Sequence, residues 1–244
     1  MKTLGIIPAR YASTRFPGKP LVDIAGKSMI QRVYEQAKKC TSLSEVIVAT
    51  DDDRIFNHVK DFGGVAIMTS PDHQSGTDRC AEVALQHPQY DVVINIQGDE
   101  PYIDPEQITK VAACFTSADV QLSTLIKRIE TLDELHNPNS PKVIINHQSE
   151  AIYFSRTPLP YLRGHEPQEW LKHFTYFKHI GIYGYRADVL QQVTKLAVSS
   201  LEKAESLEQL RWIENGYRIK VAETELETHA IDVPEDLEKL RTGI

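Results

Sequence analysis

The chain has 244 residues, with 27 lysines and arginines against 34 aspartates and glutamates, which gives a formal net charge of -7. This acidic balance excludes nucleic acid as a bulk partner, because neutralising its phosphates requires a basic face. No apolar run approaches the ~20 residues that span a bilayer, so no membrane segment is expected. A core-like strand begins almost at Met1 with no signal peptide before it, and the three cysteines lack Cys-x-x-Cys spacing. Both features predict a cytoplasmic protein with free thiols.

The first predicted element is a buried strand over Leu4 to Ile7, followed by a loop rich in cations and small residues. Pro8 is expected to end the strand because it offers no N–H to a ladder. The loop then carries Arg10, Arg15 and Lys19. Small residues allow backbone N–H groups to approach a ligand closely, and three cations suit a polyphosphate. The alternative is a solvated basic loop.

Strands and helices alternate through the first half of the chain. Strands are expected over 45–49, 65–68 and 91–96, and helices over 29–40, 54–62 and 77–86. This alternation predicts a parallel sheet with helices on both faces, whose right-handed crossovers bring the carboxyl ends of the strands to one edge. Ligands bind at that edge in open α/β sheets. The polar residues of four loops should meet there: Arg10 and Lys19, Asp51 to Asp53, Ser75, Thr77 and Arg79, and Gln97 and Asp99.

The second half is less regular. Helices are expected over 107–115, 187–196, 206–215 and 234–240, strands over 120–126, 177–185 and 219–224, and an antiparallel hairpin over 141–146 and 151–155. No repeat or linker interrupts the chain. We therefore expect a single α/β domain over 1–244, with a Rossmann-like, mixed but mostly parallel sheet and helices on both faces. Its first half, about 1–118, would bind a nucleotide, and its second half, about 119–244, would add mixed-direction strands and a lid.

Asp99 follows a buried strand, beside the expected phosphate loop. A carboxylate there can hold Mg²⁺ against phosphate oxygens, and Mg²⁺ commonly takes only one or two protein carboxylates. The alternative is an ordinary aspartate in a turn. Asp232 is the candidate second ligand, and its alternative is a helix N-cap two residues before Pro234.

Several other polar residues have both a functional and a structural interpretation. Ser75 and Thr77 lie at a predicted helix start, where hydroxyls and free N–H groups can bind a base or ribose, or simply cap the helix. Arg156 and His179 stand beside apolar runs, where a structural role is the alternative. The tract 205–211 is by itself typical of a solvated amphipathic helix. The sequence has no nucleophile–base arrangement, zinc spacing, GxGxxG or GxxxxGK[ST] motif.

Seven segments in a fixed order carry a resemblance to a known family. They are Ile7-Pro-Ala-Arg-Tyr-Ala-Ser-Thr-Arg-Phe-Pro-Gly-Lys-Pro-Leu21, His73-Gln-Ser-Gly-Thr-Asp-Arg79, Asn95-Ile-Gln-Gly-Asp-Glu-Pro101, Tyr153-Phe-Ser-Arg156, His179-Ile-Gly-Ile-Tyr-Gly-Tyr-Arg186, Leu207-Glu-Gln-Leu-Arg211 and Asp232-Val-Pro-Glu-Asp-Leu237. Together they resemble the family of 3-deoxy-manno-octulosonate (Kdo) cytidylyltransferases, in the sugar nucleotidyltransferase superfamily. The resemblance extends from Leu4 to Arg241.

The resemblance implies that CTP and the acid sugar Kdo, as small-molecule substrates, react with Mg²⁺ to give CMP-Kdo for lipopolysaccharide synthesis. It also implies a homodimer formed through the second half. Arg10 and Lys19 would act with Asp99 in catalysis, and Asp99 and Asp232 would hold the metal. The nucleotide would be bound by Ala9, Arg10, Arg15, Lys19, Ser75, Thr77, Arg79 and Gln97. The sugar would be bound by Arg156, His179, Tyr183, Glu208 and Gln209, with its carboxylate on Arg156.

Departures from the family pattern are small: Phe16, Asp78 and Thr157 replace other residues without removing a charge, so they could affect only sugar preference. The implied attack of an anomeric hydroxyl on the α-phosphorus requires charge neutralisation and in-line placement more than a covalent nucleophile. Two alternatives remain. One is a related acid sugar, such as an 8-amino Kdo analogue or a nonulosonate. The other is a catalytically silent nucleotide-binding regulator, which should have lost one of the metal or triphosphate residues.

Overall fold

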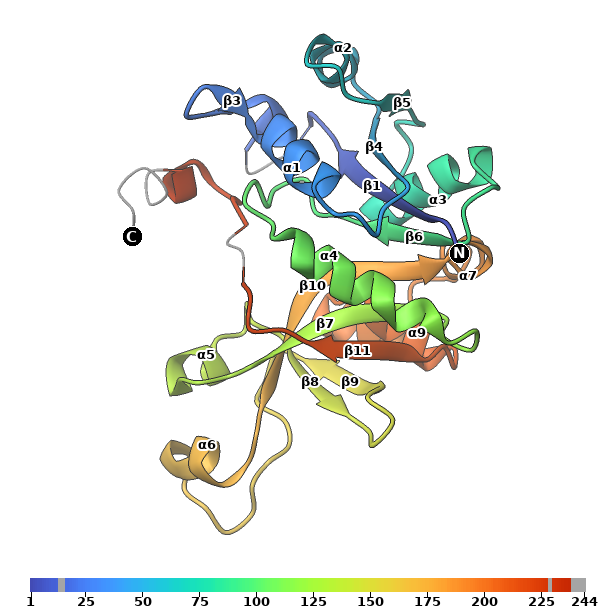
Figure 1. Cartoon of the computed structure of the whole chain (residues 1–244). Helices are drawn as coiled ribbons and strands as arrows, with labels where there is room; N and C mark the ends of the chain where they lie inside the picture. The colour runs from blue at the N-terminus through green and yellow to red at the C-terminus, as the bar shows by residue number, and fades with distance from the viewer. Residues whose placement is uncertain (13–15, 228–229, 238–244) are drawn as a thin grey trace.

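Buried apolar strands form the central sheet in the computed structural model, which describes residues 1–12, 16–227 and 230–237 (Figure 1). Within these residues nine strands make one sheet. Its main path runs in the order β11 (Ile219–Glu223), β7 (Leu122–Arg128), β10 (Phe177–Arg186), β6 (Val92–Asn95), β1 (Thr3–Ala9), β4 (Glu45–Thr50) and β5 (Ala66–Met68). The predicted hairpin, β8 (Lys142–Ile145) and β9 (Ala151–Ser155), joins it beside β10.

Strand direction separates β10 from the rest of this path. Strand β1 pairs in parallel with β4 and β6, β4 with β5, and β11 with β7. Strand β10 runs antiparallel to both of its neighbours, β6 and β7. The expectation of a mixed, mostly parallel α/β sheet is therefore confirmed.

Helices cover both faces, and alternate side chains of β1 show why. Leu4 and Ile6 point into one core with α3 (Gly76–Gln86), α7 (Ala187–Val193) and α9 (Gln209–Glu214). Ile7 and Ala9 point into the other with α1 (Met29–Lys38), α2 (Asp53–Asp61) and α4 (Pro105–Ala113). Each fully buried Leu or Ile contributes about 1.5–3 kcal/mol to such a core. Both faces of the strand are apolar because both are covered.

The prediction that Pro8 ends the first strand is wrong. Strand β1 continues to Ala9, and Pro8 lies opposite Ala49 in the pairing with β4. The pairing of β1 with β6 stops at Ile6 opposite Asn95, two residues before Pro8. The N–H that proline lacks is therefore not needed on that side.

The helix predicted over 206–215 is present but shorter, as α9 (Gln209–Glu214), and a helix that was not predicted, α8 (Ser200–Glu205), precedes it. Helix α8 ends at Ser206, whose φ of 52° is left-handed, and α9 begins at Gln209. Other short elements were not predicted: β2 (Asp23–Ile24), β3 (Lys27–Ser28), α5 (Leu132–His136), α6 (Trp170–His173) and the 3-10 turns Lys19–Leu21, Cys114–Thr116 and Pro167–Glu169. The closing helix is present over 234–237, where its described part ends. Among the helices described, none combines the length and the apolar character needed to cross a membrane.

Candidate active site

Three loops that follow parallel strands meet at the carboxyl edge of the sheet. At their junction a Cβ on Gly98 would lie 2.8 Å from the carbonyl oxygen of Pro8, so only glycine allows this close approach. The loops enclose a cavity of about 270 Å³. Its lining includes the predicted site residues Ala9, Arg10, Lys19, Ser75, Arg79, Gln97, Asp99 and Asp232. Arg15, also predicted to bind the nucleotide, lies outside the described residues.

Lys19 joins the two predicted metal ligands. Its Nζ lies 2.7 Å from Oδ2 of Asp99 and 3.5 Å from Oδ1 of Asp232. The backbone N–H of Ile231 donates to the carbonyl oxygen of Asp99 at 2.9 Å, which holds the C-terminal segment against the loop after β6. Three segments far apart in sequence thus bring one ammonium and two carboxylates together at the cavity.

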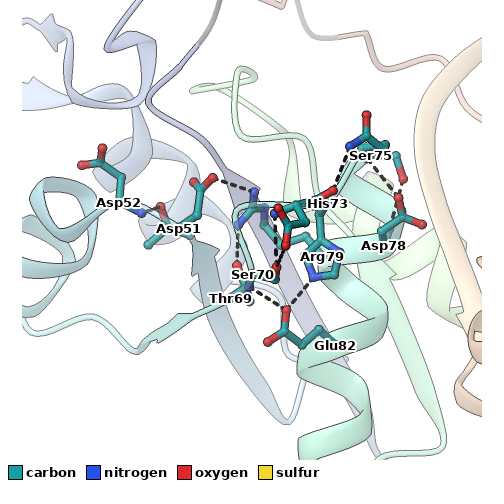
Figure 2. Close-up of polar contacts among 12 residues, drawn as sticks. Asp51, Asp52, Thr69, Ser70, His73, Ser75, Asp78, Arg79 and Glu82 are labelled. Atoms are coloured by element: carbon teal, nitrogen blue, oxygen red, sulfur yellow. Dashed lines mark hydrogen bonds and ion pairs between the residues drawn. The ribbon is translucent and has the colours of Figure 1, made fainter.

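Arg79 is a buried residue of the cavity lining, and Figure 2 shows its polar contacts. Its Nη2 lies 3.2 Å from Oδ2 of Asp51, which follows β4, and its Nη1 donates to the hydroxyl of Thr69, which follows β5. The residue is only 4% exposed. A buried cation requires such compensation, so Arg79 ties two strand ends to helix α3 in addition to lining the predicted nucleotide site.

The loop before helix α3 is held by Glu82 and by a capping box at the start of the helix (Figure 2). Glu82 accepts from the backbone N–H of Ser70 at 2.9 Å and contacts Nε2 of His73 at 2.5 Å. Ser75 and Asp78 form a capping box, each side chain accepting from the other's backbone N–H at 3.1 Å. Ser75 therefore caps the helix while it lines the cavity, and Asp78 completes the cap.

Thr77 and Glu208 contact each other. The Thr77 hydroxyl donates to Oε2 of Glu208 at 2.9 Å, and Thr77 is buried. Burial raises the pKa of Glu208, and the hydrogen bond from Thr77 offsets part of that rise. Thr77 was predicted to bind the nucleotide and Glu208 to bind the sugar. This hydrogen bond, between α3 and the start of α9, therefore links the predicted nucleotide residues to the predicted sugar residues.

Two of the predicted sugar residues carry buried polar atoms that lack a partner among the residues the structure describes. They are the hydroxyl of Tyr183 and Nε2 of Gln209. A buried donor without an acceptor costs about 1–3 kcal/mol. Such atoms in a folded protein commonly meet a ligand or ordered water.

His179 is a neutral donor in strand β10. Its Nε2 lies 2.9 Å from the hydroxyl oxygen of Thr124, which also lies 3.1 Å and 2.8 Å from the carbonyl oxygens of Ile180 and Ile182. A hydroxyl has one proton and carbonyls only accept, so Thr124 donates to a carbonyl and accepts from His179. Burial lowers the pKa of His179 to about 3. The ring therefore carries its proton on Nε2 and leaves Nδ1 as an acceptor.

Arg156 is bound by backbone carbonyls. Its Nε, Nη1 and Nη2 donate to the carbonyl oxygens of Glu205, Pro138 and Ser206 at 2.6, 2.9 and 3.2 Å. The carboxylate of Glu205 accepts the backbone N–H of Arg156 at 2.9 Å. Guanidinium has five N–H donors, so two remain for a ligand.

Gln97 connects the loop that follows β6 to β10. Its Nε2 donates to the carbonyl oxygen of Gly181 at 2.9 Å. Gly181 lies where the pairing of β10 with β7 shifts register, between Ile180 and Tyr183. Such irregularities redirect side chains beside functional sites.

The sequence did not reveal which residues position the predicted site residues through hydrogen bonds and ion pairs. Asp51 was expected at the same sheet edge as Arg79, within the cluster Asp51 to Asp53, but not as the ion partner of Arg79. Thr124 in its strand and Glu205 in its helix carry no local signal, because their partners His179 and Arg156 are 55 and 49 residues away.

Comparisons with known proteins agree on one family. Residues 4–221 match the family model described as cytidylyltransferase. A protein of Parabacteroides distasonis named 3-deoxy-manno-octulosonate cytidylyltransferase is 59% identical, with 98% of this chain and 96% of the relative covered. A protein of the same name from Cytophaga hutchinsonii is 58% identical, with 96% and 94% covered.

Solved structures give the same result for the fold. A CMP:2-keto-3-deoxy-manno-octonic acid synthetase complexed with CTP has a TM-score of 0.91 and 45% identity, covering 99% of this chain and 98% of its own. A 4-diphosphocytidyl-2C-methyl-D-erythritol synthase from Anaerococcus prevotii has a TM-score of 0.61 at 12% identity, covering 99% and 98%. The second likeness concerns the fold alone.

Proposed function

Because the chain belongs to the 3-deoxy-manno-octulosonate cytidylyltransferase family, we propose that its cavity joins CTP to Kdo, giving CMP-Kdo and pyrophosphate. One observation carries the assignment of the site. Lys19 and the carboxylates of Asp99 and Asp232 gather beside the loop that begins with Arg10. Cations for a triphosphate and oxygen ligands for a divalent ion are what nucleotidyl transfer requires of a protein.

Arg10 and Lys19 neutralise the triphosphate in this proposal. Both line the cavity, at the two ends of the loop after β1. Ala9, Ser75 and Gln97 surround the cytidine, and Thr77 lies buried in the first turn of α3, which Ser75 caps. Arg79 contributes its guanidinium from the buried side, and Arg15 belongs to the same nucleotide set by resemblance.

Asp99 and Asp232 would hold Mg²⁺. Their oxygens already converge on one cationic atom, the Nζ of Lys19, at 2.7 and 3.5 Å. Two carboxylates that meet at one cation fit a hard ion that prefers oxygen ligands and takes its remaining ligands from phosphate and water. When bound, such an ion polarises the α-phosphate and lowers the pKa of the attacking hydroxyl.

The transfer itself forms one P–O bond and breaks another. The anomeric hydroxyl of the sugar loses its proton to solvent water and its oxygen attacks the α-phosphorus, the bond to the bridging oxygen breaks, and pyrophosphate leaves. Positioning and charge neutralisation supply most of the rate in such reactions. Arg10 and Lys19 therefore act by holding the phosphates in line rather than by forming a covalent intermediate.

The sugar meets the chain at β10 and α9 in this proposal. The hydroxyl of Tyr183 and Nε2 of Gln209 offer donors that lack partners in the described structure. His179 offers its Nδ1 as an acceptor, and Glu208 offers a partly buried carboxyl group. The carboxylate of Kdo pairs with the two N–H groups of Arg156 that its carbonyl partners leave over.

We further propose that the protein is a cytoplasmic homodimer that serves lipopolysaccharide synthesis. Free Cys40, Cys80 and Cys114 agree with a reducing compartment. Ile152, Tyr161 and Phe174 in the second half are large apolar residues exposed by 51%, 72% and 41%. Burial of such side chains is the usual driving force of subunit association. Analytical ultracentrifugation of the purified chain tests the dimer, and a monomer at micromolar concentration contradicts it.

Pyrophosphate release tests the reaction. We expect release only when CTP, Kdo and Mg²⁺ are all present, with each omitted in turn as a control and ATP, GTP and UTP as competing nucleotides. Turnover with an 8-amino Kdo analogue or a nonulosonate but not with Kdo would transfer the assignment to that sugar. CTP binding without release from any sugar in the panel would instead identify a silent regulator, although Arg10, Lys19, Asp99 and Asp232 are all retained.

A further inference from the structure

Tyr11 lies at the base of the loop that carries the triphosphate cations. The backbone N–H of Gly18 donates to the carbonyl oxygen of Tyr11 at 3.0 Å, which closes the loop between Arg10 and Lys19. Gly18 has a φ of 73°, a left-handed conformation that favours glycine, and a Cβ there would lie 3.1 Å from the Tyr11 ring. The returning backbone thus packs directly on the ring.

Arg54 covers the Tyr11 ring. Its guanidinium carbon lies 3.3 Å from the ring centroid, within cation–π distance. Its Nε and Nη2 donate to the two carboxylate oxygens of Asp52 at 2.9 and 2.6 Å. A bidentate pair of this kind fixes the plane of the guanidinium.

Helix α2 anchors this arrangement. Asp52 is the N-cap of α2, since its side chain accepts the backbone N–H of Arg54 at 2.9 Å. Ile55 and Val59 hold the helix in the buried core. Asp52 and Arg54 are therefore attached to a rigid element.

From these contacts we propose that Tyr11, Arg54 and Asp52 are positioning residues for the triphosphate. The inference rests on the proposed function, in which Arg10 and Lys19 bind the phosphates. Asp52 orients Arg54, and Arg54 holds the Tyr11 ring. Tyr11 in turn accepts the hydrogen bond from Gly18, and these two residues are the direct neighbours of the cations Arg10 and Lys19.

The physical effect is preorganisation. Arg10 and Lys19 flank Tyr11 and Gly18, which are joined by a hydrogen bond before CTP arrives. Residues that are already held lose less conformational freedom when CTP binds, so more of their interaction energy contributes to affinity. Loss of the Arg54 contact should weaken CTP binding by about two- to fivefold, the factor that corresponds to an exposed cation–π contact. The affinity for the sugar should not change, because its proposed residues lie on other elements.

A matched pair of substitutions on helix α2 separates contact from charge. Arg54→Gln and Lys60→Gln each remove one positive charge, but Lys60 lies 5.7 Å over the ring of Phe56 rather than over Tyr11. Calorimetry with CTP alone and steady-state kinetics are then measured for both. We expect Arg54→Gln to raise the CTP dissociation constant and the KM for CTP about two- to fivefold, with the KM for Kdo unchanged. Lys60→Gln should have the same CTP dissociation constant and KM values as the parent protein. Equal losses of CTP affinity in both variants would overturn the proposal.

A double-mutant cycle tests the order of the contacts. Tyr11→Phe keeps the ring and should keep CTP affinity, whereas Tyr11→Ala should weaken it at least as much as Arg54→Gln. Adding Arg54→Gln to Tyr11→Ala should weaken binding no further, because the contact is already lost. Asp52→Asn preserves a good N-cap but removes the ion pair, so it should match Arg54→Gln.

Two further outcomes would reject the proposal, and a third would reject a different claim. Full additivity of the double variant, or parental affinity in Tyr11→Ala, shows that Tyr11 does not transmit the effect of Arg54. Because CTP binding is measured without Kdo, it tests the positioning role even where turnover fails. Absence of pyrophosphate release in the parent protein counts against the proposed function alone.

Discussion

The nucleotide end and the sugar end of the proposed site are built differently. At the nucleotide end, formal charges such as Lys19 and Asp99 come from loops that follow parallel strands, and they line an open cavity. At the sugar end, His179 and Tyr183 belong to the antiparallel strand β10, and Glu208 and Gln209 precede or begin α9. Most of these groups are neutral, and they are buried or bonded to the protein.

The difference follows from what each substrate offers. A triphosphate is recognised by charge, which acts over several ångströms and tolerates modest displacement. An acid sugar differs from its analogues in single hydroxyl or amino groups, which must be distinguished by hydrogen bonds. A desolvated site penalises the wrong ligand strongly, because its buried polar groups are then left unpaired. Selectivity for the sugar should therefore reside in β10 and α9.

The strongest test of the charged end is Asp99→Asn. Loss of the carboxylate should reduce turnover by roughly a thousandfold, since several kcal/mol of charge stabilisation are removed from the transition state. The thermal unfolding midpoint should hardly change, because the pair with Lys19 is partly exposed and contributes little to stability. Asp188→Asn, an exposed carboxylate on α7, is the control for both measurements. A large drop in midpoint for Asp99→Asn would favour a structural turn residue.

The second test separates structural from substrate-binding charge. Asp51→Asn leaves Arg79 buried without its ion partner, which should lower the free energy of unfolding by about 2–3 kcal/mol. Urea unfolding measures this change. Asp53→Asn, the exposed neighbour in the first turn of α2, should cost under about 1 kcal/mol. Similar small costs in both variants would mean that the Arg79 pair is not a stabilising contact.

The third test concerns pH and the sugar end. The pKa of His179 in the folded protein is about 3, below its ordinary 6.5, so the stability it confers is present above pH 6.5. As the pH falls from 6.5 toward 3 the unfolded chain takes up a proton that the folded protein does not. Stability should then fall by at most about 1.4 kcal/mol per pH unit. Urea unfolding of His179→Gln should show a shallower decline over that range, and an identical decline would contradict a neutral His179.

The smallest expected effect is that of Gln209→Leu. Loss of one hydrogen bond to the sugar should raise the KM for Kdo by about five- to tenfold. CTP affinity should be unchanged, and stability should be equal or higher, because Nε2 of Gln209 has no partner in the described structure. An increase in the CTP dissociation constant would show that the two ends are not separable as described.

The sequence was sufficient to predict that most residues of the proposed nucleotide end gather at one edge of the sheet. Apolar strands alternating with amphipathic helices determine a parallel sheet, and topology alone then gathers Lys19, Gln97 and Asp99 at one edge. Family resemblance added Asp232, which by itself resembled a helix cap. The prediction failed at Pro8 because strand pairing ends at different residues on the two sides of β1.

The sugar end depends on features without a local signal. The break between α8 and α9 rests on a left-handed serine, Ser206, a conformation that sequence patterns rarely reveal. The contact of His179 with Thr124 depends on a register shift in β10, which no periodicity indicates. Arg156 is held by carbonyls whose approach requires the complete fold. The roles of these residues in sugar binding remain predictions.

The pairing of strand β10 fixes the position of the predicted sugar residues relative to the predicted nucleotide loops. Strand β10 is hydrogen-bonded to β6 on one side and β7 on the other, with Tyr183 directly opposite Asn95. A slip of one residue in this register would turn the side chains of Tyr183 and Tyr185 to the other face of the sheet. Gly184, which has no side chain, could then lie opposite Asn95 in place of Tyr183. The pairing of β10 with β6 thus sets the distance between the predicted sugar residues and the loop that follows β6. Motions that admit substrates must then belong to the loops, because the sheet continues unbroken from one end of the site to the other.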